Sequence, residues 1–154
     1  MIVAWRLCKA RHAKNAFDGE GARREGGRWN SRGIPVVYLA ESLALAALEQ
    51  FVHIPRAAAG IAFVSFKVEI PAEAKVAELD VGALPPNWRA EPVPGETMAI
   101  GDAWFKGKTT PVLRVPSVIV PEEFNYVLNI FHPDYRKIRI RSPRAFGFDP
   151  RMWK

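Results

Sequence analysis

The sequence predicts an α+β fold: a single compact domain over residues 1–154, with mainly antiparallel sheets and few short helices. Strand patterns outnumber helix patterns and do not alternate regularly with them, which argues against a doubly wound α/β fold. The 13 prolines fall mostly between apolar runs and so limit the length of helices. With 154 residues and 49% hydrophobic residues, the chain has the size and apolar content of one domain with its own core.

The clearest strand pattern lies at residues 62–70. Apolar side chains at every second position alternate there with Ser65, Lys67 and Glu69, so we expect one face to be buried in an antiparallel sheet. Shorter apolar runs bounded by proline, glycine or charged residues predict six further strands, at residues 2–7, 36–39, 75–79, 112–115, 118–120 and 138–140.

The best helix pattern covers residues 42–54. Ser42 can cap its first turn, strong helix formers follow, and Pro55 ends it because the residue before a proline avoids the helical region. A second helix is predicted over residues 96–105. The proline-rich stretch 82–96 is expected to be a long surface connection within the same domain, since too little chain lies on either side for two cores.

The composition excludes several classes of protein. Cys8 is the single cysteine, so no internal disulfide can form, and the scattered histidines show no spacing typical of metal ligands. No apolar run approaches the ~18 residues of a membrane span, and the N-terminus becomes charged too early for a signal peptide. We therefore expect a cytoplasmic protein that binds neither metal nor membrane.

The net charge of +6 is unevenly distributed along the chain. Residues 1–33 and residues 134–154 each carry a net +5, whereas residues 34–133 carry −4. Basic ends can contact nucleic acid, or they can surround a pocket for a phosphorylated small molecule, because both ligands present anionic oxygens. Charge alone does not choose between these two partners.

Residues 17–33 form the most unusual stretch of the sequence. They contain five of the eleven glycines and four arginines, a combination that lets the backbone approach a ligand and lets guanidinium groups bind phosphate or carboxylate. The stretch matches neither a Walker loop nor a GxGxxG fingerprint. Composition alone allows an exposed loop with solvated arginines equally well.

Three further residues are candidates for a site. Tyr38 lies in an apolar strand, where a tyrosine is most often a core residue. Glu49 lies at the edge of the apolar stripe of the predicted helix, where a charged group needs a partner or a wet cavity. Ser117 follows Pro116 between two apolar runs, and its simplest interpretation is a turn residue.

Taken together, these residues resemble the RES domain, named for its arginine, glutamate and serine, which is the toxin half of bacterial RES–Xre toxin–antitoxin pairs. The resemblance covers nearly the whole chain. The segments that carry it are Trp5-Arg6, Gly26-Gly27-Arg28-Trp29-Asn30 with Gly33, the strand ending at Tyr38, Ala47-Leu48-Glu49, Val115-Pro116-Ser117, Asn125-Tyr126-Val127-Leu128-Asn129 and His132-Pro133.

The resemblance implies a fold similar to the ADP-ribosyltransferase toxins and the consumption of NAD+ with release of nicotinamide. The acceptor of ADP-ribose would be a protein, water or phosphate, and the expected partner is an Xre-type helix-turn-helix antitoxin. By position, Arg28, Tyr38, Glu49 and Ser117 match the family's active-site residues, and Arg6 matches a further arginine. No metal and no direct contact with nucleic acid are implied.

The chemistry of these side chains agrees with the resemblance. Cleavage of the ribose–nicotinamide bond passes through an oxocarbenium-like state, which the carboxylate of Glu49 would stabilise. Arg28 would bind the pyrophosphate or the nicotinamide amide, Tyr38 would stack on the nicotinamide, and Ser117 would hold its amide.

A second hypothesis is a basic RNA-binding protein or ribonuclease toxin without NAD+ chemistry. It would use His53 or His132 as acid or base, and the basic pI near 9.8 favours it. The sequence shows no recognisable RNA-binding motif and no clustered aromatic residues.

Overall fold

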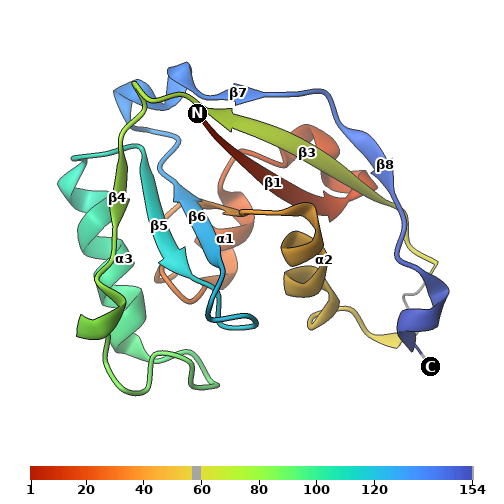
Figure 1. Ribbon diagram of the computed structural model, residues 1–154, viewed down its shortest axis with the longest axis horizontal. Coiled ribbons are helices and arrows are strands. Elements are labelled where there is room, and N and C mark those ends of the chain that lie inside the picture. Colours follow the sequence, from red (N-terminus) through yellow and green to blue (C-terminus); the bar gives the residue numbers. More distant parts are fainter. Residues whose placement is uncertain (57–59, 154) are drawn as a thin grey trace.

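A curled sheet forms the centre of the protein (Figure 1). The structure is a computed structural model that describes residues 1–56 and 60–153. Its strands follow the spatial order β4-β5-β6-β2-β1-β3-β7, and β8 also pairs with β3. The strands are β1 (Ile2–Lys9), β2 (Val37–Ala40), β3 (Phe63–Ile70), β4 (Val76–Glu78), β5 (Val112–Pro116), β6 (Phe124–Leu128), β7 (Arg139–Ile140) and β8 (Arg144–Phe146).

The predicted fold class is confirmed. Every strand pair is antiparallel except the parallel pair of β4 and β5, and the helices are few. The strand predicted at residues 62–70 is β3, but the expectation of a single buried face is wrong. Phe66, Val68 and Ile70 are buried on one face, and Phe63 and Ser65 are buried on the other.

The strand predicted at residues 118–120 is wrong. These residues form a turn, because the Ser117 hydroxyl accepts hydrogen bonds from the backbone N–H groups of Ile119 and Val120, both at 3.1 Å. The chain then returns as β6, a strand that was not predicted from the sequence. β6 pairs with β2 on one side and β5 on the other, so it is a central strand of its half of the sheet.

Within the described part of the chain, three α-helices accompany the sheet: α1 (Glu20–Glu25), α2 (Leu43–Phe51) and α3 (Gly95–Gly107). Short 3₁₀ turns lie at Ala10–Asn15, Val81–Ala83, Pro133–Lys137 and Pro150–Trp153. The predicted cap of α2 is confirmed, since Ser42 Oγ accepts a hydrogen bond from the N–H of Leu45 at 3.0 Å. α2 ends at Phe51, three residues before the predicted end, and turns occupy the residues between it and Pro55.

The sheet consists of two halves that meet at one point. β1 pairs with β3 along its whole length, but it pairs with β2 only through Trp5 and Ala40. Ala40 is the last residue of β2, and no further residue of β2 pairs with β1, so the two strands separate from this pair toward Val37. One half therefore contains β4, β5, β6 and β2, and the other contains β1, β3, β7 and β8 (Figure 1).

Three apolar clusters lie around the sheet, and helices α2 and α3 contribute to two of them. α2 packs on β1 and β2, and Leu45 and Ala46 share a buried cluster with Leu7, Ala40 and Phe63. Ile100, Trp104 and Phe105 of α3 pack against the half-sheet residues Leu113, Val115 and Val127, together with Trp29 and Val36. A third cluster between the two halves holds Ala4, Val37, Leu39, Val68, Ile70, Val112 and Leu128, among others. None of the described helices has the length and apolar composition needed to cross a membrane.

Candidate active site

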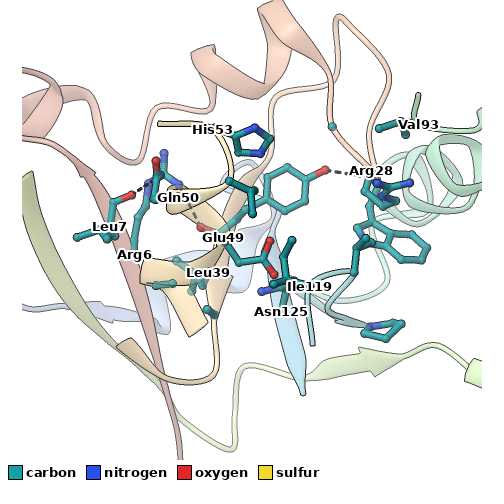
Figure 2. Close-up of a pocket in the computed structure, with 18 of the residues that line it drawn as sticks. Arg6, Leu7, Arg28, Leu39, Glu49, Gln50, His53, Val93, Ile119 and Asn125 are labelled. Carbon is teal, nitrogen blue, oxygen red and sulfur yellow. Dashed lines mark hydrogen bonds between the residues drawn. The ribbon is translucent and has the colours of Figure 1, made fainter. Parts of the chain in front are cut away.

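A pocket of about 470 Å³ opens where β1 and β2 diverge. Its walls come from β1, β2, α2, the glycine-rich segment 26–29, the segment around residues 91–93 and the turn after β5. Arg6, Arg28, Tyr38 and Glu49 line it, although they lie far apart in the sequence. Figure 2 shows Glu49 between Arg6 and Gln50 on one side and Arg28 and Val93 on the other. The structure thus brings the predicted site residues together.

Glu49 is held in place by Ser117. The Ser117 hydroxyl donates a hydrogen bond of 2.7 Å to Glu49 Oε1. Ser117 Oγ in turn accepts hydrogen bonds from the N–H groups of Ile119 and Val120, and these two bonds occupy both lone pairs of the hydroxyl oxygen. The hydroxyl proton of Ser117 therefore points at Glu49, and the hydrogen bond that it donates orients the Glu49 carboxylate.

Ser117 itself lies behind the carboxylate. It is fully buried and is not among the residues that line the pocket, whereas Pro116, Val118 and Ile119 are. The position assigned to Ser117 is therefore suited to orienting Glu49, and the role of holding a nicotinamide amide would require another group.

Tyr38 presents its ring to the pocket and not its hydroxyl. The hydroxyl donates to Asn30 Oδ1 at 2.6 Å and accepts the N–H of Trp29 at 3.1 Å. Burial is the main cause that raises the pKa of Tyr38 well above its ordinary value, and the Trp29 N–H opposes this shift in part. Tyr38 is therefore a neutral, anchored ring on which a flat ligand can stack.

The close packing around Tyr38 requires glycine at position 27. A Cβ on Gly27 would lie 2.8 Å from the Tyr38 hydroxyl and 2.8 Å from Asn30 Oδ1. Gly26 adopts φ +71°, in the left-handed region that side chains disfavour. The two glycines of the segment therefore serve the approach of its backbone to Tyr38.

Arg6 reaches into the gap between the two halves of the sheet. Its Nη1 donates to the carbonyl of Tyr38 at 3.0 Å, and its Nε donates to the carbonyl of Ala16. Burial lowers the pKa of the Arg6 guanidinium, opposed by the charges of Cys8 and Asp18. Arg6 thus replaces part of the missing backbone pairing between β1 and β2 and keeps a cation in the pocket wall.

Arg28 connects the pocket to the segment 88–91. Its guanidinium donates to the carbonyls of Trp88, at 3.2 Å, and of Ala90, and it forms an ion pair with Glu91. The Arg28 side chain is 11% exposed and that of Glu91 is 71% exposed. Arg28 therefore lies at the pocket wall with a carboxylate partner that can leave it for an anionic ligand.

Asn30 and Gln50 are two site residues to which the sequence analysis assigned no role. Asn30 is fully buried, and its amide donates to the carbonyls of Ala22 and Ile34, at 2.9 and 3.1 Å, while it accepts from Tyr38. Gln50 Nε2 donates to the Leu7 carbonyl at 2.8 Å and joins α2 to β1 beside Glu49. The position of Asn30 in the sequence, between Gly27 and Gly33 and two residues after Arg28, could have indicated a role for it, whereas nothing in the sequence indicated a role for Gln50.

The two histidines of the ribonuclease hypothesis occupy different positions in the structure. His53 is exposed at the rim of the pocket, whereas His132 caps the 3₁₀ turn Pro133–Lys137 by accepting the N–H of Asp134 at 3.0 Å. Among the described residues, no group of three or more His, Cys, Asp or Glu side chains is placed to hold a metal ion.

The curled, mostly antiparallel sheet is a fold that also occurs in a solved toxin–antitoxin complex. A chain of the M. tuberculosis MbcT–MbcA toxin–antitoxin complex has a similar structure, with a TM-score of 0.78 and 20% identity, covering 99% of this chain and 86% of that one. The RES domain model matches residues 3–149, and the chain belongs to the RES domain family.

Curated relatives agree with this assignment. The chain is 40% identical to the Prs ADP-ribosylating toxin of Sphingobium sp. (strain YBL2), over 96% of this chain and 94% of that protein. It is 36% identical to Toxin Res of Yersinia enterocolitica, over 98% and 99%, and 39% identical to Toxin Res of Photorhabdus laumondii, over 99% and 98%. The predicted resemblance to RES toxins is confirmed.

Proposed function

We propose that this protein is a toxin that consumes NAD+. It cleaves the bond between nicotinamide and ribose and transfers ADP-ribose to an acceptor, and this arrests growth. The observation that supports the proposal most strongly is the Glu49 carboxylate, fixed by Ser117 in a pocket that also presents Tyr38 and two arginines. The name of the Sphingobium relative, an ADP-ribosylating toxin, supports the same reaction class.

Glu49 would act on the ribose of NAD+. The bond from ribose C1′ to the nicotinamide nitrogen breaks, its electron pair leaves with nicotinamide, and positive charge develops on C1′ and the ring oxygen. A carboxylate near the ribose stabilises that charge more in the transition state than in the ground state. The acceptor then donates a lone pair to C1′, and its proton is released to solvent.

The other pocket residues would bind the dinucleotide. A volume of about 470 Å³ falls within the ~300–1,000 Å³ typical of small-molecule sites. The ring of Tyr38 provides a stacking surface for nicotinamide. Arg6 and Arg28 provide cations for the pyrophosphate, and Arg28 would exchange Glu91 for a phosphate oxygen.

An antitoxin partner is part of the proposal. The structural neighbour comes from a toxin–antitoxin complex, and a toxin kept in its own cell must be silenced. We infer that an antitoxin of the Xre helix-turn-helix type binds this chain. For the acceptor of ADP-ribose we retain protein, water and phosphate, since all three attack the same carbon.

Release of nicotinamide from NAD+ by the purified protein tests the proposal. We expect stoichiometric nicotinamide and ADP-ribose products, detected by chromatography, and loss of both with Glu49→Ala or Arg28→Ala. Glu25→Ala is the matched control, because Glu25 is exposed and outside the pocket. Undiminished turnover by Glu49→Ala would refute the assigned role of this residue.

A further inference from the structure

The outer edge of the half-sheet that contains β1 carries a cluster of exposed cationic side chains. Lys67 lies on β3, Arg139 on β7 and Arg144 on β8, and Arg141 follows β7 directly; all four are exposed. We call these four residues the basic edge. Three of them belong to residues 134–154, the part of the chain whose net +5 the pocket does not use.

The strand register places these side chains on one face. Glu69 pairs with Arg139 and Ser65 pairs with Arg144, and directly paired residues of neighbouring strands point to the same side. Lys67 lies between Ser65 and Glu69 and shares their face by the two-residue period. β7 and β8 run along β3 at the border of the molecule (Figure 1), and the side chains of all four residues of the basic edge are exposed there.

Most of the charge of the basic edge is not neutralised within the protein. Arg141 Nη2 lies 2.6 Å from Glu69 Oε1, and the Glu69 side chain is only 12% exposed. Within residues 1–56 and 60–153, no ion pair engages Lys67, Arg139 or Arg144. Glu69 also lies opposite Arg139 in the register, but one carboxylate cannot neutralise four cations, so the basic edge keeps a net positive charge that favours an anionic partner.

The basic edge lies beside the pocket and not over it. Trp5 pairs with Lys67 in the register of β1 and β3, and Trp5 also lines the pocket. Of the described residues that line the pocket, none belongs to the basic edge. A partner bound to the basic edge would therefore be adjacent to the pocket and would leave its opening accessible to NAD+.

We propose that the basic edge docks an acidic segment of the protein that accepts ADP-ribose. This inference rests on the proposed function, because it assigns the acceptor of the same site. An inhibitor that blocks the binding of NAD+ must cover the pocket, whereas an acceptor must leave room for NAD+ and bring a nucleophile next to it. The position of the basic edge meets the second requirement, and complementary charge would speed the encounter and orient the acceptor.

Docking changes which acceptor reacts and not the bonds that break. The C1′–nicotinamide bond breaks with its electron pair going to nicotinamide, and a side-chain oxygen or nitrogen of the docked protein forms the new bond to C1′. The proton of that side chain is released to solvent. Reaction of the same C1′ with water requires no docking. A comparison of protein labelling with hydrolysis of NAD+ therefore distinguishes an effect on the basic edge from an effect on the pocket.

Charge reversal of the basic edge tests the inference. The variant combines Lys67→Glu, Arg139→Glu and Arg144→Glu. The control combines Lys14→Glu, Arg24→Glu and Lys106→Glu, which changes the net charge equally at exposed positions outside the pocket. Two quantities are measured for each: nicotinamide release from NAD+ without added protein, and incorporation of labelled ADP-ribose into lysate protein at low salt.

We expect the basic-edge variant to release nicotinamide at the wild-type rate but to label protein at least about 10-fold less, the range by which electrostatic steering changes encounter rates. Polyglutamate added to the wild type should reduce protein labelling and leave nicotinamide release unchanged. The control variant should resemble the wild type in both measurements.

Three results would overturn the inference. Wild-type labelling by the basic-edge variant would show that the acceptor docks elsewhere, and nicotinamide release by the wild type without protein labelling would show that no protein acceptor exists. Filter binding of a single-stranded RNA that is lost in the basic-edge variant would assign the surface to nucleic acid. If the wild type releases no nicotinamide at all, the proposed function itself fails, which is a distinct outcome.

Discussion

Ser117 is fully buried, and its hydroxyl makes three hydrogen bonds, one to Glu49 and two to backbone N–H groups of the turn after β5. The same residue therefore shapes a turn and orients a carboxylate. Arg6 and Tyr38 are used in a similar way, because each makes hydrogen bonds to the backbone while part of its side chain lines the pocket. Single polar residues thus join the architecture of the pocket to its chemistry.

Removal of the Ser117 hydroxyl should impair catalysis more than binding. In Ser117→Ala, the Glu49 carboxylate loses the hydrogen bond that the serine hydroxyl donates to it, and a hydrogen bond to a charged group is worth ~1.5–3 kcal/mol. We expect kcat for nicotinamide release to fall by ~10–100-fold, with a small change in KM, because the carboxylate remains but is no longer oriented. Ser65→Ala, at a buried serine of β3, is the control. Equal effects of the two variants would contradict the positioning role.

The buried tyrosines make stability sensitive to alkaline pH. Burial raises the pKa of Tyr38, Tyr126 and Tyr135 in the folded protein, whereas in the unfolded chain a tyrosine ionises near ~10. Their contribution to stability is thus complete below pH ~10 and is lost as the pH rises above it, by up to ~1.4 kcal/mol per pH unit for each tyrosine.

Urea unfolding between neutral and alkaline pH measures this effect. The free energy of unfolding should decline above pH ~10, and Tyr38→Phe should show a shallower decline because one ionisable group is removed. The same slope in both proteins would mean that Tyr38 does not titrate differently on folding.

Residue types alone made Glu49 and Arg28 candidates but could not show their partners. Glu49 and Ser117 lie 68 positions apart, and Arg28 and Glu91 lie 63 positions apart, so only the fold brings them together. Tyr38 combines the features of a core residue and of a pocket residue, since its hydroxyl is hydrogen-bonded to Asn30 while the residue also lines the pocket.

At the scale of elements, α3 fixes the glycine-rich segment against the pocket. A Cβ at Gly101 would lie 1.6 Å from the carbonyl oxygen of Trp29, so the helix can pack at this distance only with glycine. The neighbouring Asp102 accepts a hydrogen bond of 2.9 Å from the N–H of Ser31, and a second one from its hydroxyl. α3 therefore positions Trp29 and Asn30 from behind.

Gly101→Ala should destabilise the protein, because a backbone carbonyl cannot move aside as a flexible side chain would. We expect a loss of ~1–3 kcal/mol or more from overpacking. Gly107→Ala on the same helix meets no atom within 4 Å and should be neutral or slightly stabilising. Chemical denaturation of the two variants checks this contrast, and equal stabilities would refute the close packing of α3.

Elements with a regular apolar period were predicted, and those shaped by tertiary contacts were not. Apolar residues recur at every second position of the β3 sequence, and α2 has a cap and strong helix formers, so both were found within a few residues of their bounds. The short helix α1 was missed because its glycine and arginines favour a loop by composition. The run at residues 118–120 has strand-forming residues, but the hydroxyl of Ser117 holds it in a turn.

At the scale of the whole molecule, the pocket results from the incomplete join between the two halves of the sheet. β1 and β2 share one pair, Trp5 with Ala40, and the space beyond it is bounded by α2 and the segment 26–29. The fold class could be predicted from the order of the elements, whereas this separation could not, because strand register is not visible in apolar patterns. The charge asymmetry was visible, but its division between pocket and basic edge required the structure.

The central claim, that Glu49 drives cleavage of NAD+ after binding, is tested most directly by comparing binding and turnover in Glu49→Gln. This substitution preserves the shape of the side chain and removes its negative charge. Calorimetric titration with NAD+ and an assay of nicotinamide release are made on the same preparation. We predict binding close to that of the wild type and release reduced at least ~100-fold, by analogy with the loss of one electrostatic group from a transition state. Nicotinamide release at the wild-type rate by Glu49→Gln would contradict the account.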